Sequence, residues 1–130
     1  PWKTQKTIRK VLEAWFRNDL MGIPGDEDGG AMSSFAALSM LGFFPVTPGV
    51  PEYAWGSPVF TKATIALENG KTFVLEAPGS SRAAKYIQSV TIDGKPSNRA
   101  WLGHADIVRG ARVRVEMGNR PNKAWGTAER

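Results

Sequence analysis

The sequence predicts an α+β fold in which helices come first and antiparallel strands follow. Two helix patterns fill the first 41 residues, prolines interrupt the next segment, and alternating apolar patterns with turn signals come after it. The 130 residues are about one domain's length by the usual prior. We therefore expect helices packed against antiparallel strands that form a partial sandwich.

The first helix is predicted from apolar side chains that recur at helical spacing. These side chains are Ile8, Val11, Leu12, Trp15 and Phe16. The spacing lines one face of a helix, and the charged residues fall on the other faces. Thr4 is a candidate N-cap and Gly22 a candidate stop. We expect one buried apolar stripe, with Trp15 in the core.

The second helix is predicted for residues 31–41, which are apolar or small around almost the whole helix circumference. Such a helix is buried on several sides. Its small residues, such as Ala36 and Ala37, allow neighbouring helices to approach closely. One other helix cannot surround it, so we expect residues 1–44 to be the end of a larger helical domain.

A rigid crossing loop is predicted for residues 45–62. Prolines at 45, 48, 51 and 58 exclude a continuous helix there. An antiparallel β region is predicted for residues 63–126. Its first hairpin is centred on Asn69-Gly70, a dipeptide typical of a type I′ turn with two positive φ angles.

Two further strands follow in the β region. Residues 86–92 form a strand that Asp93-Gly94 closes. Residues 112–117 alternate between charged and apolar side chains, which places Val113, Val115 and Met117 on the core face.

The composition excludes several functional classes. No cysteine is present, so disulfides, thiol nucleophiles and thiolate metal sites are ruled out. The net charge is +5, and residues 61–130 carry twelve Lys and Arg against six Asp and Glu. These cations are scattered and not gathered on one helix, so no nucleic-acid partner is expected. The apolar runs are too short for a membrane span.

Residues 25–33 hold the strongest candidate site. Asp26, Glu27 and Asp28 stand between glycines, immediately before the second helix pattern. A helix start stabilises negative charge through its free N–H groups and its dipole. A carboxylate there can act as a general base or a cation ligand. The structural alternative is that Asp26 or Asp28 caps the helix and the other side chains are solvated.

The aromatic residues offer a second kind of candidate. Tyr53 and Trp55 stand in the Gly/Pro-rich segment, where an aromatic face can stack on a sugar ring. The alternative is that they anchor the loop. His104 is the only histidine, so it has no histidine partner for a zinc site and is interpreted as structural.

Several motifs together resemble one family over nearly the whole chain. They are PWKTQ at 1–5, GIPGDEDGGAMS at 22–33, LGFFPV at 41–46, EYAWGSP at 52–58, YIQS at 86–89, WLGHADI at 101–107 and the stretch from 116 to 126. Their order is similar to that at the carboxy-terminal end of glycoside hydrolase family 92, the calcium-dependent exo-acting α-mannosidases.

The resemblance implies that residues 1–44 are the last helices of an (α/α)6 barrel, with the acidic loop at 22–33. It implies an inverting enzyme that removes terminal, α-1,2-linked mannose from glycans. Asp28 would be the general base and Asp26 its partner or alternate, with Glu27, Tyr53 and Trp55 on the substrate side. Calcium would bind the mannose O2 and O3 through ligands that we do not assign. Family members are usually exported bacterial enzymes, so a periplasmic, cell-surface or secreted location is implied.

An inverting glycosidase needs two carboxyl groups about 6.5–9.5 Å apart. Three adjacent acidic residues lie on one side of the scissile bond and cannot supply both groups. We therefore expect the general acid to come from the remainder of the parent chain, and this chain alone to be inactive. The competing hypothesis is a non-catalytic carbohydrate-binding or architectural β module that uses Trp55 and the sheet.

Overall fold

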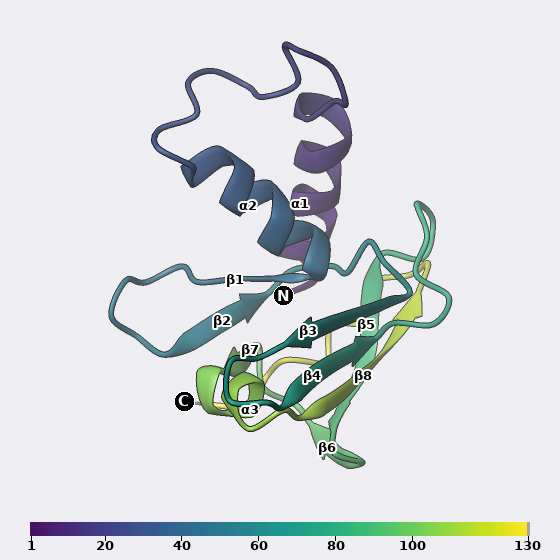
Figure 1. Ribbon diagram of the computed structural model, residues 1–130. Helices are drawn as coiled ribbons and strands as arrows, with labels where there is room; N and C mark the ends of the chain where they lie inside the picture. The colour runs from purple at the N-terminus through teal and green to yellow at the C-terminus, as the bar shows by residue number, and fades with distance from the viewer. Residues whose placement is uncertain (130) are drawn as a thin grey trace.

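The computed structural model describes residues 1–129, in which two helices stand over two β-sheets (Figure 1). The helices are α1 (Trp2–Trp15), α2 (Ala31–Leu41) and the short α3 (His104–Val108). The strands are β1 (Phe43–Phe44), β2 (Glu52–Trp55), β3 (Lys62–Ala66), β4 (Thr72–Glu76), β5 (Tyr86–Ile92), β6 (Lys95–Ser97), β7 (Trp101–Gly103) and β8 (Arg112–Gly118). The predicted α+β class is confirmed.

The strands form a three-stranded sheet in the order β1-β2-β7 and a five-stranded sheet in the order β3-β4-β8-β5-β6. Every pair is antiparallel except β4 and β8, which run parallel. The side chains of β8 alternate as predicted, since Val113 and Val115 are fully buried. The core joins both sheets and includes Phe43 and Trp55 from the smaller sheet and Phe73 from the larger one.

The crossing loop predicted for residues 45–62 is interrupted by β2. This strand pairs with β1 on one side and β7 on the other, with Tyr53 opposite Leu102. The prolines flank the strand and do not enter it, so they exclude helix without excluding a sheet. Treating the whole segment as loop was therefore wrong.

The hairpin predicted around Asn69-Gly70 is present, but its turn is not type I′. Only Gly70 has a positive φ, of 78°. The Gly70 N–H donates to the Leu67 carbonyl at 3.0 Å, and Leu67 and Lys71 close the hairpin. This is the three-residue arrangement with glycine in the left-handed position. The two-residue turn with paired positive φ angles lies instead at Asp93-Gly94, between β5 and β6.

The helix α1 buries a polar face. It begins at Trp2, so Thr4 lies inside it and is not its N-cap, and it ends before Phe16, well short of Gly22. Its buried residues are Gln5, Arg9 and Leu12. Trp15, which was expected in the core, is 61% exposed. The apolar stripe therefore lies mostly outside the contact with the sheet.

The carboxylates of the sheet do not hold Arg9; neutral oxygens do. Its guanidinium, 4% exposed, donates to Ser57 Oγ at 3.0 Å and to the Pro58 carbonyl at 2.7 Å. It also donates to Ser80 Oγ at 2.8 Å and to the Ser81 carbonyl at 3.3 Å. Burial lowers the pKa of Arg9 from its ordinary value. These bonds fix α1, and the loop that follows it, against the β region.

The predicted bounds of α2 are confirmed, but its expected burial is not. Only Ser39 is buried, and most other positions are exposed or half-buried. Phe35 packs between Phe16 and Phe44, with ring centroids 6.0 and 5.3 Å apart. One side of α2 is therefore covered by this chain and the rest is open.

Candidate active site

The loop between α1 and α2 carries the acidic residues and lies at the far end of the helices from the sheets (Figure 1). Its first part is a tight turn in which the Arg17 N–H donates to the Gly22 carbonyl at 3.0 Å and the Arg17 side chain pairs with Asp19 at 3.0 Å. A Cβ on Gly22 would lie 1.9 Å from the Arg17 carbonyl oxygen. Only glycine fits there, so this turn fixes where the acidic segment begins.

Three oxygen atoms of the acidic segment accept hydrogen bonds from the first backbone amides of α2. The Ala31 N–H donates to the Asp28 carbonyl at 3.4 Å, and the Met32 N–H donates to the Glu27 carbonyl at 3.2 Å. The Ser33 N–H donates to Glu27 Oε1 at 3.2 Å. A helix start leaves such N–H groups without partners inside the helix. Glu27 and two carbonyls thus anchor the segment, and neither aspartate side chain is needed.

Asp26 and Asp28 are exposed, and within residues 1–129 their carboxylates make no hydrogen bond or ion pair. The N-cap of α2 is Gly30, without a side-chain cap bond. The structural alternative, in which Asp26 or Asp28 caps the helix, is therefore wrong. Glu27 has that role in part.

Asp28 has a strained backbone for a residue with a side chain. Its φ is 54°, and Gly29 and Gly30 follow with φ angles of 66° and 95°. The left-handed region costs on the order of 1 kcal/mol for a residue that is not glycine. Such strain persists where the surrounding structure holds it, and here the bonds from Ala31 and Met32 do so.

Glu27 is half-buried and committed to the helix. Its Oε1 accepts from Ser33, while its Oε2 is buried without a partner among the described residues. The structure thus separates the acidic residues: Glu27 is turned toward the protein, and the two aspartates face outward. Glu27 is placed to position the loop and not to meet a ligand directly.

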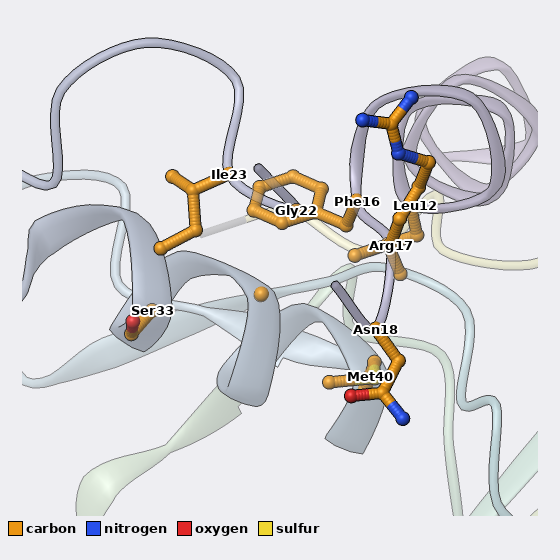
Figure 2. Close-up of a pocket in the computed structure, with 9 residues that line it drawn as sticks. Leu12, Phe16, Arg17, Asn18, Gly22, Ile23, Ser33 and Met40 are labelled. Atoms are coloured by element: carbon orange, nitrogen blue, oxygen red, sulfur yellow. The ribbon is translucent and has the colours of Figure 1, made fainter. Parts of the chain in front are cut away.

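A hollow of about 380 Å³ lies beside this loop (Figure 2). Its walls come from the end of α1, the turn and α2, and include Leu12, Phe16, Ile23, Ser33 and Met40. The acidic residues are not among its lining. Its lining is mostly apolar, which suits packing better than the many hydroxyl groups of a sugar.

Trp55 does not present a face to a ligand. It is 2% exposed and packs edge to face against Phe43 at 6.3 Å. The substrate role predicted for Trp55 is corrected to anchoring of the core. Tyr53 is half-buried, and its hydroxyl lies 2.9 Å from Nδ1 of His104. Neither aromatic residue belongs to the loop that carries the aspartates.

The described residues do not offer a complete calcium site. No group of three or more His, Asp or Glu side chains in residues 1–129 is arranged to hold a metal ion. Calcium takes six to eight oxygen ligands. The donor set of this chain therefore does not fit calcium by itself, and we derive no catalytic step through it. Among these residues no helix is long and apolar enough to cross a bilayer.

Sequence reasoning missed Arg9 and the pair of Tyr53 and His104. Arg9 was assigned to the solvent-facing side of α1 because charged residues usually lie there. A signal existed in hindsight, because Gln5 and Arg9 are one helical turn apart, and Gln5 Oε1 accepts from the Ile87 N–H at 3.1 Å. No local pattern links Tyr53 with His104, since their contact depends on sheet pairing.

Comparison with known proteins identifies the family to which the chain belongs. Residues 1–119 match the glycosyl hydrolase family 92 catalytic domain. A family GH92 inverting mannosidase from Bacteroides thetaiotaomicron is similar, with a TM-score of 0.91 and 38% identity over 98% of this chain and 17% of that protein. A family GH92 α-mannosidase from the same organism, solved with mannoimidazole, has a TM-score of 0.92 and 30% identity over the same shares.

A relative from Arthroderma benhamiae, described as an uncharacterized secreted glycosidase, is 31% identical over 99% of this chain. The chain spans 17% of that relative's length. It therefore corresponds to a part of these longer proteins. Because the family match extends over residues 1–119 and the structures superimpose, the chain belongs to glycosyl hydrolase family 92.

Proposed function

We propose that the longer protein containing this chain is an exo-acting, inverting α-mannosidase, and that this chain supplies the general base. The proposal takes its reaction from the inverting mannosidase that the chain resembles at 38% identity. The remainder of the parent chain supplies the general acid. Its substrate is a glycan with terminal mannose, in line with the relative that binds mannoimidazole.

One observation carries the assignment of the base. The acidic segment anchors itself to α2 through Glu27 and two backbone carbonyls. The carboxylates of Asp26 and Asp28 are left exposed and without partners within residues 1–129. A general base needs a carboxylate that is held in place yet free to accept a proton from water. Asp28 meets this condition best, because its backbone is held in the left-handed region at φ 54°.

The chemistry follows from that arrangement. Asp28 removes a proton from a water molecule that attacks the anomeric carbon from the face opposite the departing sugar. A carboxylic acid on the other side donates its proton to the leaving oxygen, at a separation of about 6.5–9.5 Å that leaves room for the water. Asp26, two residues before Asp28 on the same exposed loop, is the alternate base.

The open faces of the helices support a larger assembly. Trp15, Leu20 and Met21 are exposed by 61%, 103% and 79%. Large exposed apolar side chains gathered at one end of a folded structure mark a surface that is covered in the intact protein. We assign this cover to the remainder of the parent chain, as the last helices of an (α/α)6 barrel require.

Calcium dependence and α-1,2 specificity remain part of the proposal for the longer protein. Because residues 1–129 do not form a cation site of their own, some of the calcium ligands lie outside them. Export from the cell is proposed from the relative that is described as secreted. The alternative of a separate sugar-binding module loses its main support, since Trp55 is buried.

Product stereochemistry tests the proposal. The longer protein is incubated with an α-mannoside, and the anomeric proton signals of the released mannose are followed by NMR from the first minute. We expect β-mannose to appear first and α-mannose to grow in as the sugar mutarotates. If α-mannose appears first, inversion is wrong; if no mannose is released from any α-mannoside, the activity itself is wrong.

A further inference from the structure

A second hollow, of about 350 Å³, lies between the β5–β6 hairpin and α3. Its polar lining is made by Lys95, Ser97, Asn98, Arg99, Asp106 and Arg109. Figure 1 shows α3 and β6 at the opposite end of the molecule from the loop that joins α1 to α2. The hollow is therefore separate from the candidate active site.

The acidic side chains in the lining of this hollow and beside it, Asp106 and Asp93, already have partners. Asp106 accepts from Arg99 at 3.1 Å and from Arg109 at 2.9 and 3.2 Å. Asp93 accepts from Arg109 and from the Arg112 N–H. The backbone N–H of Arg112 and the side chain of Arg109 lower the pKa of Asp93, so Asp93 is charged at neutral pH. Their task is to hold two guanidinium groups side by side.

The cationic groups, in contrast, have donors to spare. Arg99 makes a single hydrogen bond within residues 1–129, although a guanidinium has five N–H donors. Lys95 is exposed, and its ammonium group makes no hydrogen bond in the same part of the chain. The hydroxyl oxygen of Ser97 is shielded from solvent and has no partner among the described residues. The cations Lys95, Arg99 and Arg109 outnumber the anions Asp93 and Asp106, so this cluster of five side chains carries one net positive charge.

We infer that this hollow binds a tetrahedral oxyanion, the phosphate or sulfate group of a small molecule or of a modified glycan. A guanidinium matches two oxygens of such a group, and a lysine adds a point charge. Ser97 also lines the hollow, and its unpartnered hydroxyl is a neutral group that a bound oxyanion could satisfy. Asp106 sets the guanidinium of Arg99 in place before the ligand arrives, which lowers the entropic cost of binding. This site does not depend on the proposed mannosidase activity.

Calorimetric titration of the longer protein at low chloride tests the inference, with sodium phosphate, sodium sulfate and a sugar phosphate as separate probes. We expect saturable binding that Lys95→Gln weakens about threefold to tenfold and Arg99→Gln by tenfold or more. Lys71→Gln, which removes the same charge from the β3–β4 hairpin, should leave the affinity unchanged. Ser97→Ala, which keeps all charges, should weaken binding about threefold.

Tighter binding of the sugar phosphate than of inorganic phosphate would support a modified glycan as ligand, and equal binding would support the free oxyanion. Three results would overturn the inference. The first is a titration that never saturates, and the second is equal affinity for acetate. The third is unchanged affinity in both Lys95→Gln and Arg99→Gln, each shown to be folded by its melting curve.

Discussion

At the scale of single residues, Asp26, Glu27 and Asp28 share a chemical type but not an environment. Glu27 is half-buried and accepts from the Ser33 amide, whereas both aspartates are exposed. The sequence alone could identify the cluster, because carboxylates before a helix pattern are informative. It could not say which of them anchors the helix, because that depends on the positive φ angles of residues 28–30.

Glu27 is predicted to position the loop and not to take part in proton transfer. In the longer protein, Glu27→Ala should lower kcat about tenfold, because the Ser33 amide loses its acceptor and the loop that carries Asp28 loosens. Glu27→Gln keeps an oxygen acceptor and should retain most of the activity. Steady-state kinetics on both variants decide the matter: equal loss in the two would mean that the negative charge of Glu27 takes part in the chemistry.

Asp93 is predicted to make the β5–β6 turn sensitive to acid. Its folded pKa lies below the ordinary value of 3.8, so the unfolded chain takes up the proton first as the pH falls. The stability that Asp93 contributes is therefore complete above that value and is lost as the pH falls through the folded pKa. Asp93→Asn retains a side chain that tolerates a positive φ and removes only the charge.

Hydrogen exchange of the peptide that contains Arg112 measures this effect in the longer protein. At pH 6 the Asp93→Asn variant should exchange faster than the unmodified protein. At a pH below the folded pKa the two should exchange alike, because Asp93 is then protonated. A difference that stays the same at both pH values would contradict the assignment.

At the scale of elements, two of the three buried residues of α1, Gln5 and Arg9, join the helix to the β region by hydrogen bonds. The guanidinium of Arg9 donates to the segments at 57–58 and 80–81. The side-chain oxygen of Gln5 accepts from the N–H of Ile87, the second residue of β5. A buried donor group of this kind is costly to remove, since several hydrogen bonds are lost together and the Ser81 carbonyl loses the donor that Arg9 supplies. The orientation of the acidic loop thus depends on Arg9.

Arg9→Met is predicted to weaken the contact between α1 and the β region by about 3 kcal/mol, because four hydrogen bonds from the guanidinium are lost. Lys10→Met, at an exposed position of the same helix, should change stability by less than about 0.5 kcal/mol. Thermal unfolding and hydrogen exchange of residues 80–87 would report both. Equal effects of the two substitutions would contradict a specific role for Arg9.

The elements with a strong local signal could be predicted from the sequence. The bounds of α2 and β5 and the inward face of β8 follow from periodicity. Other features depend on partners far along the chain. The strand β2 is defined by pairing with β1 and β7, and the parallel contact of β4 with β8 joins residues that no local pattern links. The burial of Gln5 and Arg9 on α1 was not predicted, because hydrophobic periodicity takes only apolar residues into account.

At the scale of the whole molecule, the proposed function assigns to this chain one half of a reaction centre. It spans 17% of the mannosidases that it resembles. The acidic loop is set on two helices whose outer faces remain open, next to an apolar hollow of about 380 Å³. If Asp28 is the base, as proposed, an open surface gives it no partner acid and no enclosed substrate, so the proposed catalysis requires the remainder of the parent chain.

The isolated chain is therefore predicted to release no mannose. A released-mannose assay compares it with the longer protein at equal molar concentration, on the same α-mannoside. The longer protein should turn over the substrate, and the isolated chain should match a buffer blank. Mannose release by the isolated chain, lost again on Asp28→Asn, would show that a second carboxyl group within residues 1–130 acts as the acid.

The kcat of Asp28→Asn in the longer protein, measured with and without sodium azide, tests the central claim most directly. We expect kcat to fall about 10²–10⁴-fold, because the amide cannot accept the proton of the attacking water. Azide needs no base, so it should restore turnover and yield β-mannosyl azide. Glu68→Gln, on an exposed hairpin, should behave as the unmodified protein. Turnover of Asp28→Asn within threefold of the unmodified protein would contradict the assignment of Asp28 as general base.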